Sequence, residues 1–140
     1  MDTKTYLSQI SRLDKMIKNK LAEIMQFKEL AYGLSAMKNE ERVQTSDNFD
    51  KIGNLLSRVE EMENKLDEMI DDFVDKKSII ISQIDKMENE VYYEVLFLKY
   101  VEKKKFEQIA CEMDYSWRQI IRIHGKALQE FEKKYGETYK

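Results

Sequence analysis

Proline is absent from this 140-residue chain, and glycine occurs only four times. Sheet-rich folds and alternating βα units need turn residues of these kinds, so their scarcity favours long, uninterrupted helices. No stretch approaches the roughly 18 apolar residues of a membrane span, and the N-terminal residues MDTKTYLSQI lack the apolar core of a signal peptide. We therefore expect a soluble, cytoplasmic protein without a membrane partner.

Cysteine and histidine occur once each, as Cys111 and His124. A lone thiol cannot form an internal disulfide, which fits a reducing compartment, and a zinc site of Cys and His ligands cannot be assembled. We expect Cys111 to be a small buried hydrophobic residue and His124 to pack toward the core. No Gly-rich phosphate loop is present. The sequence therefore predicts no enzyme, no metal, no cofactor and no small-molecule substrate.

Apolar residues recur at steps of three or four in two long segments, which indicates helices over about residues 3–34 and 48–89. The pattern fades over residues 35–50, where a loop is predicted. Neither helix can bury its apolar stripe alone, so we expect an all-α protein that begins with a long, coiled-coil-like antiparallel hairpin over residues 1–89. We expect this hairpin to form a homodimer or to hold another partner.

The last segment, residues 90–140, is predicted to form shorter helices that end in a helix-turn-helix domain. Ala110 is the small residue expected where its two helices cross. Asp114 is expected to take a left-handed conformation in a three-residue turn that begins at Met113. Ser116 can cap the second helix, with Gln119 completing a capping box. The remaining structural positions, which are expected to face inward, are Ile109, Met113, Ile120 and Ile123.

A run of eleven residues, 116–126, contains no acidic residue, although the chain has 27 acidic and 24 basic residues. At about 100° per residue, its cations fall on the helix face opposite the core. Arg and Gln can bond base edges and phosphates, and three lysines just before the first helix could bind phosphate. Trp117 lies near the edge of this face. It either packs against the preceding helix or contacts DNA or a partner protein. The predicted DNA-binding residues are Ser116, Trp117, Arg118, Gln119, Arg122, Lys126, Lys103, Lys104 and Lys105.

The span LFLKYVEKKKFEQIACEMDYSWRQIIRIHGKALQEF resembles region 4 of bacterial sigma factors. It is similar also to small sigma-like transcription regulators of the ArpU and RinA kind from phages and prophages of Gram-positive bacteria. The family pattern is met by Tyr115, Ser116, Arg118 and Gln119, among others, and it departs at Lys99, where Arg is usual, and at Phe106, where Trp is usual. The resemblance implies binding of double-stranded DNA in transcription inside a bacterial host cell, and it raises RNA polymerase as a further partner.

Two alternatives to a DNA-binding regulator remain open. A small-terminase-like DNA-packaging protein also pairs a helix-turn-helix with coiled-coil parts, and it would form ring-sized oligomers. A protein-interaction module could instead use the sigma-like end to bind polymerase without DNA, because residues 91–140 have nearly balanced charge.

Overall fold

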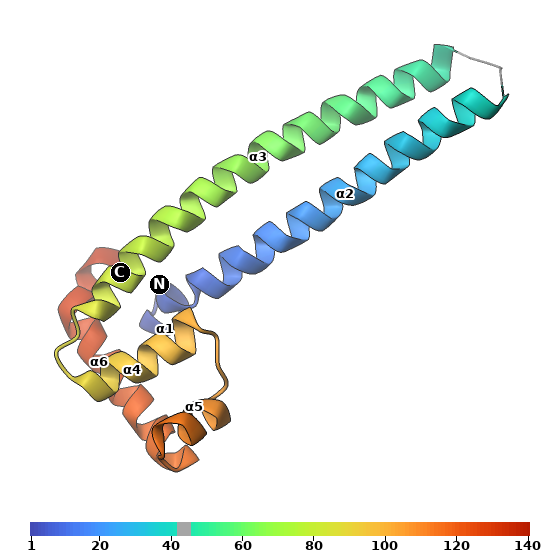
Figure 1. Cartoon of the computed structure of the whole chain (residues 1–140). Helices are drawn as coiled ribbons and strands as arrows, with labels where there is room; N and C mark the ends of the chain where they lie inside the picture. Colours follow the sequence, from blue (N-terminus) through green and yellow to red (C-terminus); the bar gives the residue numbers. More distant parts are fainter. Residues whose placement is uncertain (42–45) are drawn as a thin grey trace. The chain divides into compact units, whose positions relative to one another are not determined.

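The computed structural model describes residues 1–41 and 46–140, with the side chains of residues 37–48 left out of the description. It is all-α, and its two long helices pack antiparallel and are followed by smaller C-terminal helices, which confirms the predicted fold class (Figure 1). The elements are α1 (Thr3–Leu7), α2 (Gln9–Glu41), α3 (Ser46–Asp85), α4 (Glu90–Leu96), the π-helical η1 (Phe97–Val101), α5 (Phe106–Met113) and α6 (Trp117–Tyr139).

The loop predicted over residues 35–50 is wrong for most of its length. α2 continues to Glu41 and α3 begins at Ser46, while residues 42–45 lie outside the described part. The Ser, Asn and Asp residues that suggested a loop each disfavour a helix by less than about 1 kcal/mol. The stretch holds no Pro or Gly, so no strong helix breaker is present.

The chain divides into two compact units, one of residues 14–72 and one of residues 1–13 with 73–140. The first, which we call the hairpin unit, consists of parts of α2 and α3. Its buried apolar residues recur at helical spacing and are Ile17, Ile24, Ala31, Val59 and Leu66. An ion pair of 2.8 Å between Lys28 Nζ and Glu63 Oε1 also joins the two helices.

The second unit, which we call the base unit, is built around Phe131 of α6, a fully buried side chain. Its core includes Leu7 and Ile84 from the far ends of the hairpin sequence. Thr3 Oγ1 and Tyr139 Oη lie 2.7 Å apart and form a hydrogen bond. The compact units therefore do not divide at residues 89 and 90, where the sequence suggested a domain boundary, because the two ends of the hairpin segment share a core with α6.

The chain turns between α3 and α4 near Asn89. The Asn89 side chain accepts hydrogen bonds from the backbone N–H groups of Val91 and Tyr92 at 2.9 and 3.2 Å, which caps α4. The π-helical turn η1 follows and leads toward α5. Within the described ranges, no helix is both long and apolar enough to cross a membrane.

Candidate nucleic-acid interface

α5 and α6 pack through Ile109 and Ile120, which are both fully buried. Val95 and Leu98 belong to the same core, so α4 and η1 support the helix pair from behind. Ala110 is 7% exposed within this core. The other two structural positions are partly buried at its edge; they are Met113 and Ile123.

The turn between α5 and α6 has the predicted left-handed residue. Asp114 adopts φ 57° and ψ 39°, a conformation that Asp tolerates better than most L-residues. The Tyr115 N–H donates to the Ala110 carbonyl at 3.0 Å and closes the end of α5. Met113 is the last residue of α5, so the turn lies one residue later than the sequence suggested.

The predicted capping box at the start of α6 is present. Ser116 Oγ accepts a hydrogen bond from the Gln119 N–H at 3.2 Å, and Gln119 Oε1 accepts one from the Ser116 N–H at 2.8 Å. This reciprocal pair satisfies two backbone donors at the helix end. It also occupies the Gln119 carbonyl oxygen, which leaves the Gln119 amide N–H groups to point at a ligand.

The cationic face of α6, which we define as Arg118, Arg122 and Lys126, is exposed throughout. These residues follow each other at steps of four, so they lie on one side of the helix. The next acidic residue along α6 is Glu130. Trp117 is also open to solvent, with 51% of its surface exposed, so it is not an anchor buried against another helix.

The three lysines before α5 differ in their surroundings. Lys104 Nζ lies 3.2 Å from a Glu102 carboxylate oxygen and also forms an ion pair with Glu112. The hydrogen bond that the Lys104 ammonium donates to Glu112 raises the pKa of Lys104 above its usual range, so Lys104 stays charged and is already paired with two carboxylates. Lys105 is exposed, and Lys103 is exposed with a φ of 60°. The sequence did not reveal the two carboxylate partners of Lys104, because the Glu112 contact depends on how η1 and α5 fold together.

His124 lies behind the cationic face, packed as predicted and 7% exposed. Its Nε2 atom is 2.7 Å from the Tyr100 hydroxyl, and its ring meets the Phe106 ring edge-on with centroids 4.9 Å apart. Burial, with smaller contributions from Lys4 and Lys99, lowers the pKa of His124 to about 4. A neutral imidazole therefore fixes α6 against η1 at neutral pH.

Lys99 occupies the position where the resembling family usually has Arg. Its Nζ lies 4.2 Å from the centroid of the Phe106 ring, a cation–π contact. Phe106 is therefore held between a cation on one side and the His124 ring on another. Both departures from the family pattern, Lys99 and Phe106, meet each other in this contact.

Cys111 is exposed, which contradicts the expected burial. On α5, the buried residues Ile109 and Ala110 occupy one side of the helix, and an advance of two residues from Ile109 rotates by about 200° to the other side. Apolar neighbours in sequence were therefore a poor guide. Cys111 lines a shallow hollow of about 390 Å³ together with Lys104, Glu107, Gln108 and Glu112.

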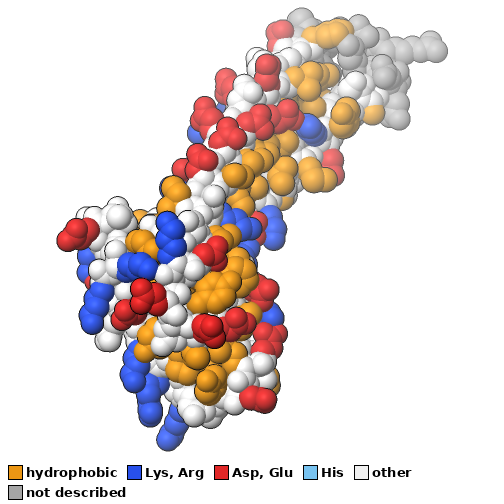
Figure 2. Space-filling model, turned by 60° about the vertical axis from the view of Figure 1, so that its left-hand side comes forward, with side chains coloured by type: hydrophobic (Ala, Val, Ile, Leu, Met, Phe, Trp, Pro, Cys, Tyr) orange, Lys and Arg blue, Asp and Glu red, His pale blue; other side chains and the backbone are white. Residues whose placement is uncertain are grey.

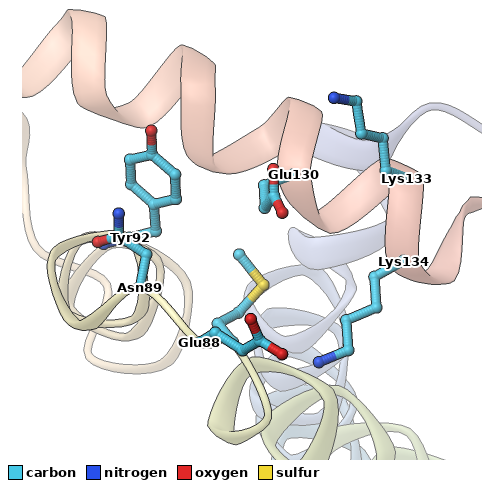
Figure 3. Close-up of a pocket in the computed structure, with 7 residues that line it drawn as sticks. Glu88, Asn89, Tyr92, Glu130, Lys133 and Lys134 are labelled. Atoms are coloured by element: carbon cyan, nitrogen blue, oxygen red, sulfur yellow. The ribbon is translucent and has the colours of Figure 1, made fainter.

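A second hollow, of about 420 Å³, lies between the start of α4 and α6. Figure 3 shows Lys133 extending away from it and Lys134 extending toward the side of Glu88. The Lys134 ammonium donates to the Lys86 carbonyl oxygen at 2.6 Å, so Lys134 ties α6 to the end of α3. The hollow is lined by Met87, Glu88, Asn89, Tyr92, Glu130, Lys133 and Lys134, which include two acidic and two basic residues. This mixed lining does not select one kind of ligand.

No group of three or more His, Cys, Asp or Glu side chains is placed to hold a metal ion in the part of the chain that the structure describes. Comparison with protein-family models, with curated proteins and with solved structures finds no match to this chain.

Proposed function

We propose that this chain, of phage or prophage origin, is a sequence-specific DNA-binding protein that regulates transcription and places α6 in the major groove. The observation that carries the proposal is an exposed, acid-free cationic face on the second helix of a helix-turn-helix. The turn, the cap and the buried core of that motif hold the face rigidly. The phage origin and the role in transcription rest on the resemblance of the C-terminal third to sigma-like regulators.

The spacing of the cationic face suits a major groove. The major groove is about 12 Å wide and admits an α-helix, and the face from Arg118 to Lys126 extends about 12 Å along α6. Either arginine can make a bidentate contact with guanine, while the lysine can neutralise a phosphate. Gln119 can donate from its amide to guanine O6, thymine O4 or phosphate.

The salt dependence of DNA binding follows from the number of cations near the motif that remain available to bind phosphate. Arg118, Arg122, Lys126 and Lys105 are exposed, whereas Lys104 is neutralised by two carboxylates. Two to four phosphate contacts, depending on whether the arginines contact bases or phosphates, give a slope of log K against log salt of about −2 to −4 for each bound helix-turn-helix. We therefore expect measurable binding at low salt and a steep loss at higher salt.

The test is a gel shift of the full-length protein on fragments of the genome that surround its own gene, at two salt concentrations. Arg118→Ala combined with Arg122→Ala should weaken binding to a selected fragment by about 1–3 kcal/mol per lost bidentate contact. Lys51→Ala combined with Arg58→Ala is the matched control, because it removes two exposed cations from α3. Circular dichroism verifies that both variants remain folded. Equal binding by both double variants would exclude α6 as the reading helix.

One observation favours a protein partner as a second candidate. Trp117 is half-exposed at the start of α6, and exposed aromatic residues are frequent anchors in protein interfaces. Failure of the wild-type protein to bind any fragment at low salt would favour this candidate. Capture of purified RNA polymerase by wild-type protein, and its loss in Trp117→Ala, would then support it.

A further inference from the structure

The hairpin unit exposes more large apolar side chains than a helix pair needs for its own seam. Figure 2 shows hydrophobic side chains along the two long helices, among charged ones. The exposed fractions on α2 are 45% for Leu21, 61% for Met25 and 73% for Tyr32; on α3 they are 52% for Leu56 and 37% for Ile70.

The Lys28–Glu63 ion pair shows that these residues belong to one surface. Met25 and Tyr32 lie about one helical turn on either side of Lys28, and Leu21 lies two turns before it. Leu56 and Ile70 lie about two turns on either side of Glu63. Residues at these spacings share a helix face with the charged residue between them.

The result is a continuous surface across α2 and α3, which we call the ion-pair face. Its members are Leu21, Met25, Lys28, Tyr32, Leu56, Glu63 and Ile70.

We propose that the ion-pair face binds the ion-pair face of a second copy of this chain, so that two hairpin units form a four-helix bundle. The α2 part of the unit, residues 14–41, is about 40 Å long, and two helices side by side are about 20 Å wide. One face thus offers about 800 Å² per copy, the amount that a stable interface of standard size buries on each partner.

The charge on the two helices selects how the second copy is oriented. Over residues 46–72, α3 carries nine acidic and three basic residues, whereas α2 over residues 14–41 carries five of each. Placing α3 on α3 of the other copy would oppose two strongly acidic helices. Placing α2 on α3 avoids this repulsion and brings Lys28 near Glu63 of the second copy.

A twofold axis along the hairpin satisfies this pairing, because each α2 then lies level with the antiparallel α3 of the other copy. The two hairpins are therefore parallel, and both chains leave the bundle at the same end, where residues 13 and 73 lie. The inference does not depend on what α6 binds.

Light scattering of the full-length protein tests the interface directly. The wild type should have twice the mass of the 16.8 kDa chain. Met25→Glu places a carboxylate in the apolar interface and should raise the dimer dissociation constant about tenfold or more. Leu30→Glu is the matched control, because Leu30 is 54% exposed on another side of the same helix, and it should change that constant less than about threefold.

Both substituted side chains are exposed in the single chain, so circular dichroism should show unchanged helix content. A monomeric wild type, a ring-sized mass, or an equal effect of Met25→Glu and Leu30→Glu would overturn the proposed interface.

The distance between two spin labels tests how the two hairpins are oriented. Each copy carries one label at position 15, in a protein with the substitutions Cys111→Ser and Lys15→Cys. Lys15 is exposed on α2, about 20 Å along the helix from the Lys28–Glu63 level. Parallel hairpins place the two labels at the same level, within about 25 Å across the bundle. Antiparallel hairpins separate them by about 40 Å along the axis, and that distance would overturn the orientation.

Discussion

His124 is the residue whose ionisation depends most on the fold. Its pKa is lowered from 6.5 to about 4 because burial disfavours the imidazolium, and the charges of Lys4 and Lys99 act in the same direction. Between these two values the unfolded chain binds more protons than the folded one. The contribution of His124 to stability therefore rises with pH through this window and is lost as the pH falls from 6.5 toward 4.

We predict that His124→Gln makes stability less sensitive to pH in this window. At pH 7 the variant should lose about 1–2 kcal/mol, because the packed imidazole and its hydrogen bond with Tyr100 are altered. Urea unfolding of the wild type and of His124→Gln at pH 7 and pH 5 measures this effect. The difference in the free energy of unfolding between the two proteins should be smaller at pH 5. A gap that is independent of pH would show that the imidazole does not titrate with a lowered pKa.

At the scale of the element, α6 begins with a capping box that uses a residue of the proposed reading surface. Gln119 Oε1 holds the Ser116 N–H, so this side chain serves helix stability and, in the proposed function, DNA contact. Glutamate at this position keeps the acceptor and places a negative charge at a helix N-terminus, where such a charge is favourable. The two roles of Gln119 are therefore separable by one substitution.

Gln119→Glu should leave the free energy of unfolding unchanged or raise it by a few tenths of a kcal/mol, while it weakens DNA binding through repulsion of phosphate. Gln119→Ala should lower the free energy of unfolding by about 0.5–1 kcal/mol, since the side-chain oxygen that accepts from the Ser116 N–H is lost. Thermal unfolding and gel shifts of the two variants give both quantities. Undiminished DNA binding by the glutamate variant would place Gln119 outside the DNA interface.

At the scale of the whole molecule, the N-terminal turn belongs to the same core as the end of α6. Leu7 is fully buried in the core that holds Phe131, and the Tyr6 and Tyr139 rings stack with centroids 4.1 Å apart. The first residues of the chain therefore stabilise the base unit, which contains α5 and α6.

Leu7→Ala should lower the free energy of unfolding by about 2–5 kcal/mol, the usual cost of truncating a buried leucine. Leu21→Ala is the comparison, since Leu21 is 45% exposed, and in dilute monomer it should change stability by less than about 0.5 kcal/mol. Denaturant unfolding followed by circular dichroism measures both. A mild effect of Leu7→Ala would mean that α1 contributes little to the base unit.

Much of the fold was predictable because its signals are local. Apolar spacing predicted the long helices, and Asp114 with Ser116 predicted the turn and the cap of α6. The loop over residues 35–50 was predicted wrongly, because moderate helix propensities are a weak guide where no Pro or Gly interrupts the chain. Cys111 is exposed although its sequence neighbours are apolar, because its angle around α5 places it away from the buried Ile109.

The sequence by itself determined which residues of α6 share a face, because the 3.6-residue period of a helix fixes angular positions without reference to the rest of the chain. The tertiary structure alone decided that Lys104 is neutralised by Glu112, that Lys99 lies over Phe106, and that Leu7 packs in the core of Phe131. Those contacts join residues on different elements or at opposite ends of the chain. Their formation depends on how the helices pack, which no local period encodes.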